Sequence, residues 1–372
     1  MPASRVIPVL VGATVCLCAG ARAQDSPFGI RGLGVPGRFE SVSARATGGA
    51  FAPFDPLSGL TEASIANTRT LTATAAGATS FLSDDIAGQH GSRRTGRFPL
   101  FQVLGPAWHG VVLGGGFSTY LDRSYRVLIS DTVTLGGSPQ AVTDELSSDG
   151  GVSDIRFVAA RRFGALALGA GVHLLAGSSR LLARRTFTDT SAYRNVIQAD
   201  EVAYSGAGAS VSAVLSVRRT LALAAYYRTD SRLTGDVGGQ TVFRSDLPTT
   251  MGAGLRWEPA PDARFAAAVS HSTWASAVDS GAFNTTAWSA GAELGSARLP
   301  LRLGVRQAQL PFGPGGSAPR ELAIAAGTGL SVAHGLGVID VTLERLRRTG
   351  AGLAESGWTV LVGLTLRPTL RQ

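Results

Sequence analysis

The residues able to perform chemistry are few in this sequence and are spread along it. The histidines occur singly, without the paired spacing that zinc ligands show within one element. Both cysteines fall within the first 23 residues, so the rest of the chain has no thiolate for a metal, a disulfide or a nucleophile. The histidines are His90, His109, His173, His271 and His334. We therefore expect no metal site and no cofactor.

One stretch matches a nucleotide-binding pattern in letters only. Residues 32–37 read GLGVPG, which fits the G-x-G-x-x-G fingerprint of dinucleotide-binding folds. That fingerprint follows a buried strand and opens a helix, whereas here Pro36 interrupts the entry to a helix. The sequence also lacks a nucleophile elbow and a local Ser/His/Asp pattern, so we expect no enzyme. A hydrolase whose residues come from separate segments stays open as an alternative.

The 34 basic residues are all arginine, and the formal net charge is +8. They are scattered, with no basic run of five or more, so nucleic-acid binding is not expected. Four of them lie in alternating segments on the side opposite the apolar residues: Arg156, Arg256, Arg302 and Arg306. They could attract the carboxylate head group of a ligand. The favoured interpretation is that they pair with acids on the same side, such as Asp154, Glu293, Asp340 and Glu344.

The first residues have the composition of an export signal. Arg5 precedes an apolar stretch over residues 6–20, and Ala21-Arg22-Ala23 offers a small-x-small cleavage site. A helix that spans a membrane needs roughly 20 apolar residues, more than this stretch provides. We therefore expect residues 1–23 to be a signal peptide, cleaved after Ala23, and the mature chain to reach the outer membrane of a Gram-negative bacterium.

The rest of the chain alternates between apolar residues and small or polar ones, which predicts β-strands. From Ile339 to Glu344, for example, every second residue is apolar and the ones between are polar. About fourteen such segments occur, and several exceed the roughly 5–6 residues usual for soluble strands. The predicted strands are 68–81, 97–104, 108–121, 150–162, 165–186, 199–217, 220–234, 241–258, 263–275, 284–295, 299–309, 319–333, 337–349 and 355–367.

Short turns alternate with longer polar loops between these strands, and the longest loop covers residues 121–150. Aromatic residues gather near the strand ends, where they could form two interfacial girdles. They are Trp108, Phe163, Trp257 and Phe265 beside short turns, and Tyr120, Tyr227, Trp274 and Trp288 towards long loops. A soluble β-sandwich would alternate too, but these features favour a membrane barrel. We predict an all-β fold, a transmembrane antiparallel β-barrel of about fourteen strands with both chain ends on the periplasmic side.

Residues 24–67 precede the first predicted strand and contain SARATGGAFAPFDPLSGL at 43–60, which is too rich in Gly and Pro for a helix and too apolar for a free tail. A fourteen-stranded barrel is wider than its own side chains can fill. We predict that residues 24–67 form a hatch in the lumen of a barrel spanning 68–372. Gly48 and Gly49 would let this hatch bend, while Phe51 and Phe54 would line a ligand pocket or only wedge the hatch in place.

The stretch at 43–60 resembles the hatch signature of FadL-type outer-membrane transporters of hydrophobic compounds. The resemblance continues through FPLFQVLGP and LGGGFSTYLDRSY and returns in DLPTTMGAGLRWEPAPDARF and in the C-terminal part of the chain, in order. It implies a fourteen-stranded barrel with an N-terminal hatch, and passive uptake of long-chain fatty acids or other apolar molecules. Two departures stand out: Glu62-Ala63-Ser64 replaces the family's Asn-Pro-Ala, and the chain ends in Arg371-Gln372 instead of an aromatic residue.

The family opens its wall laterally at a kink in the third strand. In this chain the third predicted strand contains Gly114, Gly115 and Gly116, and glycine weakens a strand interior and often marks a bend. The resemblance therefore implies a lateral gate at these glycines. The alternative is that they only make room for the hatch.

These observations together predict a channel for passive uptake of hydrophobic small molecules, by way of a hatch-lined pocket and a lateral opening. Its expected partners are outer-membrane lipid, the hydrophobic substrate and the barrel assembly machinery. The alternative belongs to another class: a PorV-like barrel that serves as a protein-interaction platform in secretion. Such a platform would need long, ordered outer loops.

Overall fold

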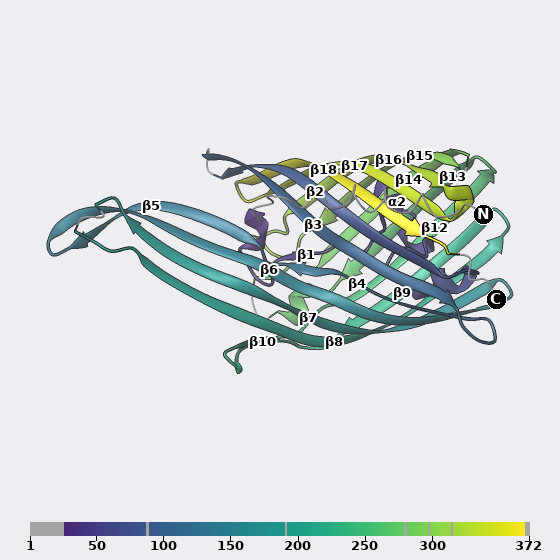
Figure 1. Cartoon of the computed structure of the whole chain (residues 1–372), viewed down its shortest axis with the longest axis horizontal. Helices are drawn as coiled ribbons and strands as arrows, with labels where there is room; N and C mark the ends of the chain where they lie inside the picture. The colour runs from purple at the N-terminus through teal and green to yellow at the C-terminus, as the bar shows by residue number, and fades with distance from the viewer. Residues whose placement is uncertain are drawn as a thin grey trace, which may run out of the picture.

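The computed structural model describes residues 26–86, 89–189, 192–278, 281–296, 298–313 and 315–368. The expected cleavage site after Ala23 and the terminal Arg371-Gln372 lie outside these residues. The described residues form one sheet of 18 strands, of which 14 close into an antiparallel barrel (Figure 1). No helix in these ranges is long and apolar enough to cross a membrane. The all-β class and the number of barrel strands are confirmed.

Each barrel strand pairs with its neighbours along the chain, and the barrel closes where β18 pairs with β2. The barrel strands are β2 (Thr72–Ile86), β3 (Gln89–Pro106), β4 (Val111–Asp122), β6 (Ser138–Phe163), β7 (Leu166–Phe187), β8 (Val196–Arg218), β9 (Leu221–Asp230), β12 (Thr249–Ala260), β13 (Ala263–Ser272), β14 (Thr285–Ser296), β15 (Leu299–Gln309), β16 (Arg320–Val332), β17 (Gly337–Gly350) and β18 (Leu353–Leu366). Two predicted strands, 220–234 and 241–258, contain breaks. The second break lies at Pro248, which has no N–H to donate to a ladder.

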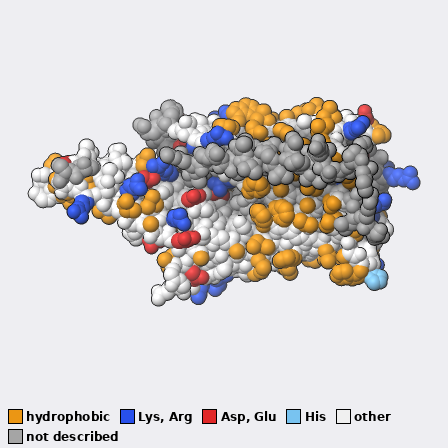
Figure 2. Space-filling model, viewed as in Figure 1, with side chains coloured by type: hydrophobic (Ala, Val, Ile, Leu, Met, Phe, Trp, Pro, Cys, Tyr) orange, Lys and Arg blue, Asp and Glu red, His pale blue; other side chains and the backbone are white. Residues whose placement is uncertain are grey.

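Side chains of opposite character alternate along each barrel strand. On β17, Leu343 is 46% exposed on the outer side, whereas the neighbouring Glu344 is 2% exposed and points into the lumen. Figure 2 shows hydrophobic side chains spread over the outer side of the barrel. An exposed apolar wall around a polar interior is the arrangement that a β-barrel needs in a lipid bilayer.

Six of the eight aromatic residues predicted for the girdles are exposed on the outer side: Trp108, Phe163, Tyr227, Trp257, Phe265 and Trp288. The assignment of Tyr120 and Trp274 was wrong, because both are buried in the interior. The pairing of β4 with β6 shifts register between Thr119 and Leu121, which leaves Tyr120 in a bulge. Trp274 begins the short helix α3 (Trp274–Ala277), and its ring packs on Phe312 at 5.4 Å.

The loop predicted at residues 121–150 is folded into strands. β5 (Tyr125–Leu135) pairs with the first part of β6, and the adjoining parts of β7 and β8 continue this sheet. The resulting extension projects beyond the barrel, at the left of Figure 1. A second hairpin, β10 (Leu233–Val237) and β11 (Gln240–Ser245), pairs with β8.

The chain before β2 lies within the barrel (Figure 1). It forms η1 (Pro27–Gly29), β1 (Val35–Pro36), α2 (Val42–Ala46), η2 (Ala52–Phe54) and η3 (Glu62–Asn67). We call residues 26–67 the hatch; its status as a separate domain stays a prediction. α2 contacts β15 to β18, and η3 contacts β6, β7 and β8. A side chain at the wall position Gly169 would overlap the backbone of Glu62 and Ala63, so the hatch packs where the wall has a glycine and no side chain.

Candidate substrate cavity and hatch anchors

A cavity of about 210 Å³ lies between the hatch and the barrel wall. Aromatic side chains on one side of it come from four elements: Phe39 of the hatch, Tyr120 of β4, Tyr226 of β9 and Trp274 of α3. An apolar cavity of about 150 Å³ is enough to hold benzene, whereas drug-sized ligands occupy about 300–1,000 Å³. The cavity therefore has the size of a single-ring molecule.

Two of the four hatch residues predicted to bind ligand, Gly48 and Gly49, line this cavity. Their φ angles of 67° and 91° are in the left-handed region that favours glycine, and a side chain on Gly48 would press against the backbone of Val305. Phe54 packs instead against Ala222 and Ala224 of the wall. Phe51, like Phe54, is outside the cavity lining. A ligand-binding role for these four residues stays a prediction.

Arg228 of β9 lies on the aromatic side of the cavity. Its guanidinium carbon is 5.4 Å from the ring centre of Phe39 and 4.9 Å from that of Tyr120, within the range of cation–π attraction. Asp154 and Asp230 accept its hydrogen bonds at 2.7 and 2.8 Å. These carboxylates balance the guanidinium charge, so the aromatic side of the cavity is not a strong anion site.

The four predicted lumen arginines all point inward. Arg302 donates to Glu293 at 2.6 Å and to Asp340 at 2.7 Å, while Arg306 pairs with Glu321. Arg256 pairs with Glu258 at 3.0 Å, and its guanidinium lies 5.1 Å from the ring centre of Phe54. Arg156 instead bonds neutral acceptors: Gln102 at 2.8 Å, and Ser118 and the Gly59 carbonyl at 3.3 Å. Arg256, Arg302 and Arg306 thus have the acid partners that the favoured interpretation required, and Arg156 does not.

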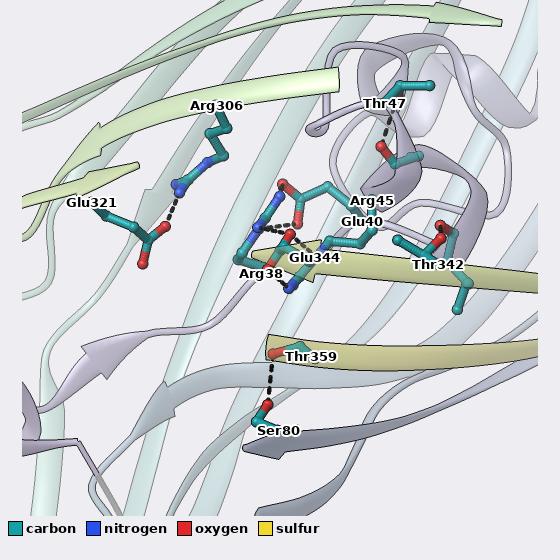
Figure 3. Close-up of polar contacts among 12 residues, drawn as sticks. Arg38, Glu40, Arg45, Thr47, Ser80, Arg306, Glu321, Thr342, Glu344 and Thr359 are labelled. Atoms are coloured by element: carbon teal, nitrogen blue, oxygen red, sulfur yellow. Dashed lines mark hydrogen bonds and ion pairs between the residues drawn. The ribbon is translucent and has the colours of Figure 1, made fainter. Parts of the chain in front are cut away.

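Ion pairs anchor the α2 end of the hatch to the wall. Glu344 of β17 accepts from Arg38 at 2.8 Å and from Arg45 at 2.6 Å, and Figure 3 shows both arginines directed at it. Burial alone would raise the pKa of Glu40, but the guanidiniums of Arg38, Arg45 and Arg306 outweigh burial and hold that pKa at about 2. The carboxylate of Glu40 therefore stays charged well below neutral pH.

A second polar cluster, which the sequence did not reveal, holds η3. Asp154, His173 and Ser210 lie on three neighbouring strands, with His173 Nδ1 at 2.9 Å from Asp154 Oδ1 and Nε2 at 2.7 Å from Ser210 Oγ. Ser210 and Ser212 donate to the two carboxylate oxygens of Glu62 at 2.5 and 2.6 Å. Glu62 is one of the residues at which this chain departs from the family's hatch signature.

The Asp154–His173–Ser210 geometry resembles the arrangement in serine hydrolases. A hydrolase also needs hydrogen-bond donors for the oxyanion, usually free backbone N–H groups near the nucleophile. Here Ser210 lies inside β8, which is paired with β7 and β9 on its two sides. Glu62 already occupies the space beside the Ser210 hydroxyl. The cluster is therefore suited to hold the hatch, and it gives the hydrolase alternative no support.

On one side of β4, the neighbouring strand β3 covers only part of its length. Among the described residues, β3 pairs with β4 only from Leu100 to Pro106, opposite Val112 to Ser118. Beyond Ser118, the hatch strand β1 takes the place of β3: Val35 and Pro36 pair with Asp122 and Leu121. The ladder is continuous on both sides of Gly114 to Gly116, and the stretch that β3 leaves unpaired begins at Thr119, three residues after Gly116.

A second cavity, of about 170 Å³, extends from this stretch of β4 along the inner faces of β2, β3 and β16 to β18, where Arg45, Glu344 and Arg348 line it. Its lining includes Thr95 and Pro99 of β3, Thr119 of β4 and Val35 of β1. Residues 36–38 of the hatch line both cavities. These three residues therefore lie between the two cavities.

No family model and no curated protein matches the sequence. Solved structures do match over almost the whole chain. The CymD monoaromatic hydrocarbon channel aligns with a TM-score of 0.58 at 13% identity, covering 91% of this chain and 99% of its own. The toluene transporter TodX of Pseudomonas putida aligns with a TM-score of 0.57 at 14% identity, covering 90% of this chain and 98% of its own. The chain shares their fold. This is the fold expected from the resemblance to FadL-type transporters.

Proposed function

We propose that this protein is an outer-membrane channel for the passive uptake of small hydrophobic molecules of single-ring size. The observation that carries the proposal is the pair of lumen cavities that share hatch residues 36–38, one lined by aromatic residues and the other reaching the stretch of β4 that β3 leaves unpaired. In this proposal the leader is removed after Ala23, and the barrel assembly machinery inserts the mature chain.

The size of the lumen cavity separates two substrate classes. About 210 Å³ accommodates a molecule such as toluene and is below the range of about 300–1,000 Å³ for pockets that hold drug-sized ligands. The two solved channels described above are named for monoaromatic hydrocarbons and toluene, which is consistent with this size. We therefore propose monoaromatic molecules, in place of long-chain fatty acids, as the substrate class.

A lateral exit suits such a substrate. Moving an apolar molecule from the cavity into water would cost about 25 cal/mol for each Å² of apolar surface. In this proposal the passage from the lumen towards the bilayer is the stretch of β4 that β1 covers in place of β3. Uptake would then require β1 and residues 36–38 to move away from β4.

A reversible cross-link tests this route. Val35 and Asp122 are directly paired, and such pairs have Cα atoms about 4.5–5.5 Å apart, which a disulfide can bridge. In cells without their own transporter, the double variant Val35→Cys/Asp122→Cys should take up labelled toluene when reduced and lose at least about tenfold in rate when oxidised. Locking Thr349→Cys to Ala354→Cys, a pair of β17 and β18, is the control and should leave uptake unchanged.

Two outcomes would count against the proposal. Equal uptake by the oxidised and reduced Val35/Asp122 variant would exclude a route past β1. Uptake of labelled oleate as efficient as that of toluene would contradict the size argument. A folded barrel that transports neither probe would favour the interaction platform.

One observation favours that second candidate function. A platform needs ordered outer loops, and the extension made by β5 with parts of β6, β7 and β8 is ordered strand. Deletion of residues 126–147 separates the two candidates. A channel should keep toluene uptake after the deletion, whereas a platform should lose its partner in a pull-down from the outer membrane.

A further inference from the structure

Buried polar side chains join η3 of the hatch to three wall strands in one continuous chain of contacts. It runs from Asp154 on β6 through His173 on β7 and Ser210 on β8 to Glu62 of the hatch, with contacts of 2.9, 2.7 and 2.5 Å. All four residues are 6% exposed or less. Since buried polar groups must be paired, a hydrogen atom has to lie in each contact.

Counting those hydrogen atoms fixes the protonation of the cluster. Asp154 also accepts from Arg228 at 2.7 Å, so it is an ionised acceptor and the hydrogen of its contact with His173 belongs to Nδ1. The Ser210 hydroxyl has one hydrogen, which can go to Glu62 or to His173 but not to both. The remaining contact needs one more proton, carried by His173 Nε2 or by Glu62. In the docked hatch, His173 and Glu62 therefore share one proton.

The charges around His173 and Glu62 also indicate one shared proton. The titratable and charged groups that face it come from β4, β6 and β9: Tyr120, Asp154, Arg156, Arg228 and Asp230. Together with Glu62, these described residues supply three carboxylates against two guanidiniums. One proton on the His173–Glu62 pair makes the cluster neutral. Burial favours that state, because an uncompensated buried charge is costly.

We infer that Glu62 and His173 form a proton-dependent latch, which holds η3 against the wall and releases it as the pH rises. Loss of the proton leaves one of the two contacts of Ser210 without a hydrogen and gives the cluster a net negative charge. Withdrawal of η3 removes the contact that lacks a hydrogen. It also exposes the Glu62 carboxylate to water, so that the negative charge is no longer buried. This inference rests on the proposed function, because Glu62, His173 and Ser210 line the lumen cavity that is proposed to hold the substrate.

The difference of one bound proton between the docked and the released hatch sets how steeply docking depends on pH. The docked hatch binds one proton more than the released hatch, so the ratio of docked to released molecules should fall by up to about tenfold for each unit of rising pH. The ratio should level off at low pH, where the released hatch also binds the proton, and at high pH, where the docked hatch has lost it.

A spin label on η3 measures this ratio directly. Asn67 ends η3 and is exposed, and the only cysteines are Cys16 and Cys18. The full chain carrying Cys16→Ser, Cys18→Ser and Asn67→Cys can therefore be labelled at one site with a nitroxide. Its mobile fraction is read by electron paramagnetic resonance in lipid nanodiscs from about pH 5 to about pH 9, after heat-modifiable gel migration has shown a folded barrel.

Matched variants identify the latch. The amide of Glu62→Gln donates to Ser210, which then gives its hydrogen to His173, so this variant should keep η3 immobile at every pH. Ser210→Ala should make η3 mobile at every pH. Glu293→Gln removes a lumen carboxylate that pairs with Arg302 on the wall, and it should keep the response of the parent protein.

The expected result is a mobile fraction that rises with pH in the parent and in Glu293→Gln and stays low in Glu62→Gln. A parent whose mobile fraction does not change with pH, or a Glu62→Gln variant that responds like the parent, overturns the latch. Toluene uptake is measured separately on the same variants. A latch that responds to pH while uptake is absent leaves the inference standing and refutes the proposed transport.

Discussion

Glu344 fixes the α2 end of the hatch, and its removal tests that anchor. It is 2% exposed and accepts hydrogen bonds from Arg38 and Arg45, whose side chains are 12% and 13% exposed. Removing one partner of a buried ion pair costs about 3–5 kcal/mol. The lower end of that range applies here, because Arg38 keeps Glu40 as a partner. In Glu344→Ala we therefore expect α2 docking to weaken by about 3 kcal/mol, equivalent to about 100-fold in the released fraction.

Hydrogen exchange of α2 measures this change. The amides of Arg45 and Thr47 bond to the carbonyls of Ser41 and Ala44 at 2.9 and 3.1 Å, so they exchange when α2 opens. In barrels held in nanodiscs, mass spectrometry of the peptide covering residues 41–47 should show about 100-fold faster exchange in Glu344→Ala. The control is Arg345→Ala on the same strand, because Arg345 lies over Trp358 on the lipid side and has no contact with the hatch.

Equal protection of α2 in Glu344→Ala and in the parent, with both barrels folded, would refute this reasoning. It would mean that the ion pairs contribute little and that the seating of α2 against β15 to β18 is sufficient to hold it.

Two further predictions concern the hatch at low pH and the strand glycines. The pKa of Glu40 is lowered from 4.5 to about 2, so its contribution to docking is fully present above about pH 4.5 and is lost as the pH falls towards 2. Exchange of α2, corrected for intrinsic rates, should stay constant from about pH 6 to about pH 4.5 and rise below that; a rise that begins at higher pH contradicts the ion-pair argument. Replacing Gly114, Gly115 and Gly116 together by Val should slow toluene uptake, because a side chain at Gly114 would press on Val158 and one at Gly116 on the backbone of Phe101; heat-modifiable gel migration checks that the barrel is folded. Gly77→Val on β2 is the control, since a side chain there meets open space, and an unchanged rate in the triple variant removes the glycines from the gate.

The strands were predictable because their alternation is a local property of the sequence. β7 illustrates this: residues 165–186 predicted one long strand, and the structure has it from Leu166 to Phe187. Tyr120 shows where local reasoning fails. A bulge after Thr119 turns it into the lumen, and no pattern within β4 marks that position. Pro248 marks the break between β11 and β12, but the alternation on its two sides predicts one strand over 241–258.

The polar cluster at η3 could not be predicted, because it depends on how far each strand is shifted against the next. His173 is directly paired with Arg156 and with Gly208, and it reaches Asp154 and Ser210 only diagonally across the sheet. The periodicity of each strand gives the side on which a residue lies but not its height in the barrel. Glu62 adds a contact from outside the sheet, which strand patterns cannot supply at all.

The ion pairs that hold α2 and the polar cluster that holds η3 differ in how they depend on pH, so we infer different roles for them. The carboxylate of Glu40 beside the α2 anchor stays ionised down to about pH 2, so its charge does not change over the pH range in which the proposed latch changes. η3 lies between α2 and β2, and β2 is fixed in the barrel wall. Release of the proton at Glu62 would therefore free only the chain between two fixed points. The aromatic cavity would change shape, while the α2 anchor would keep the hatch inside the barrel.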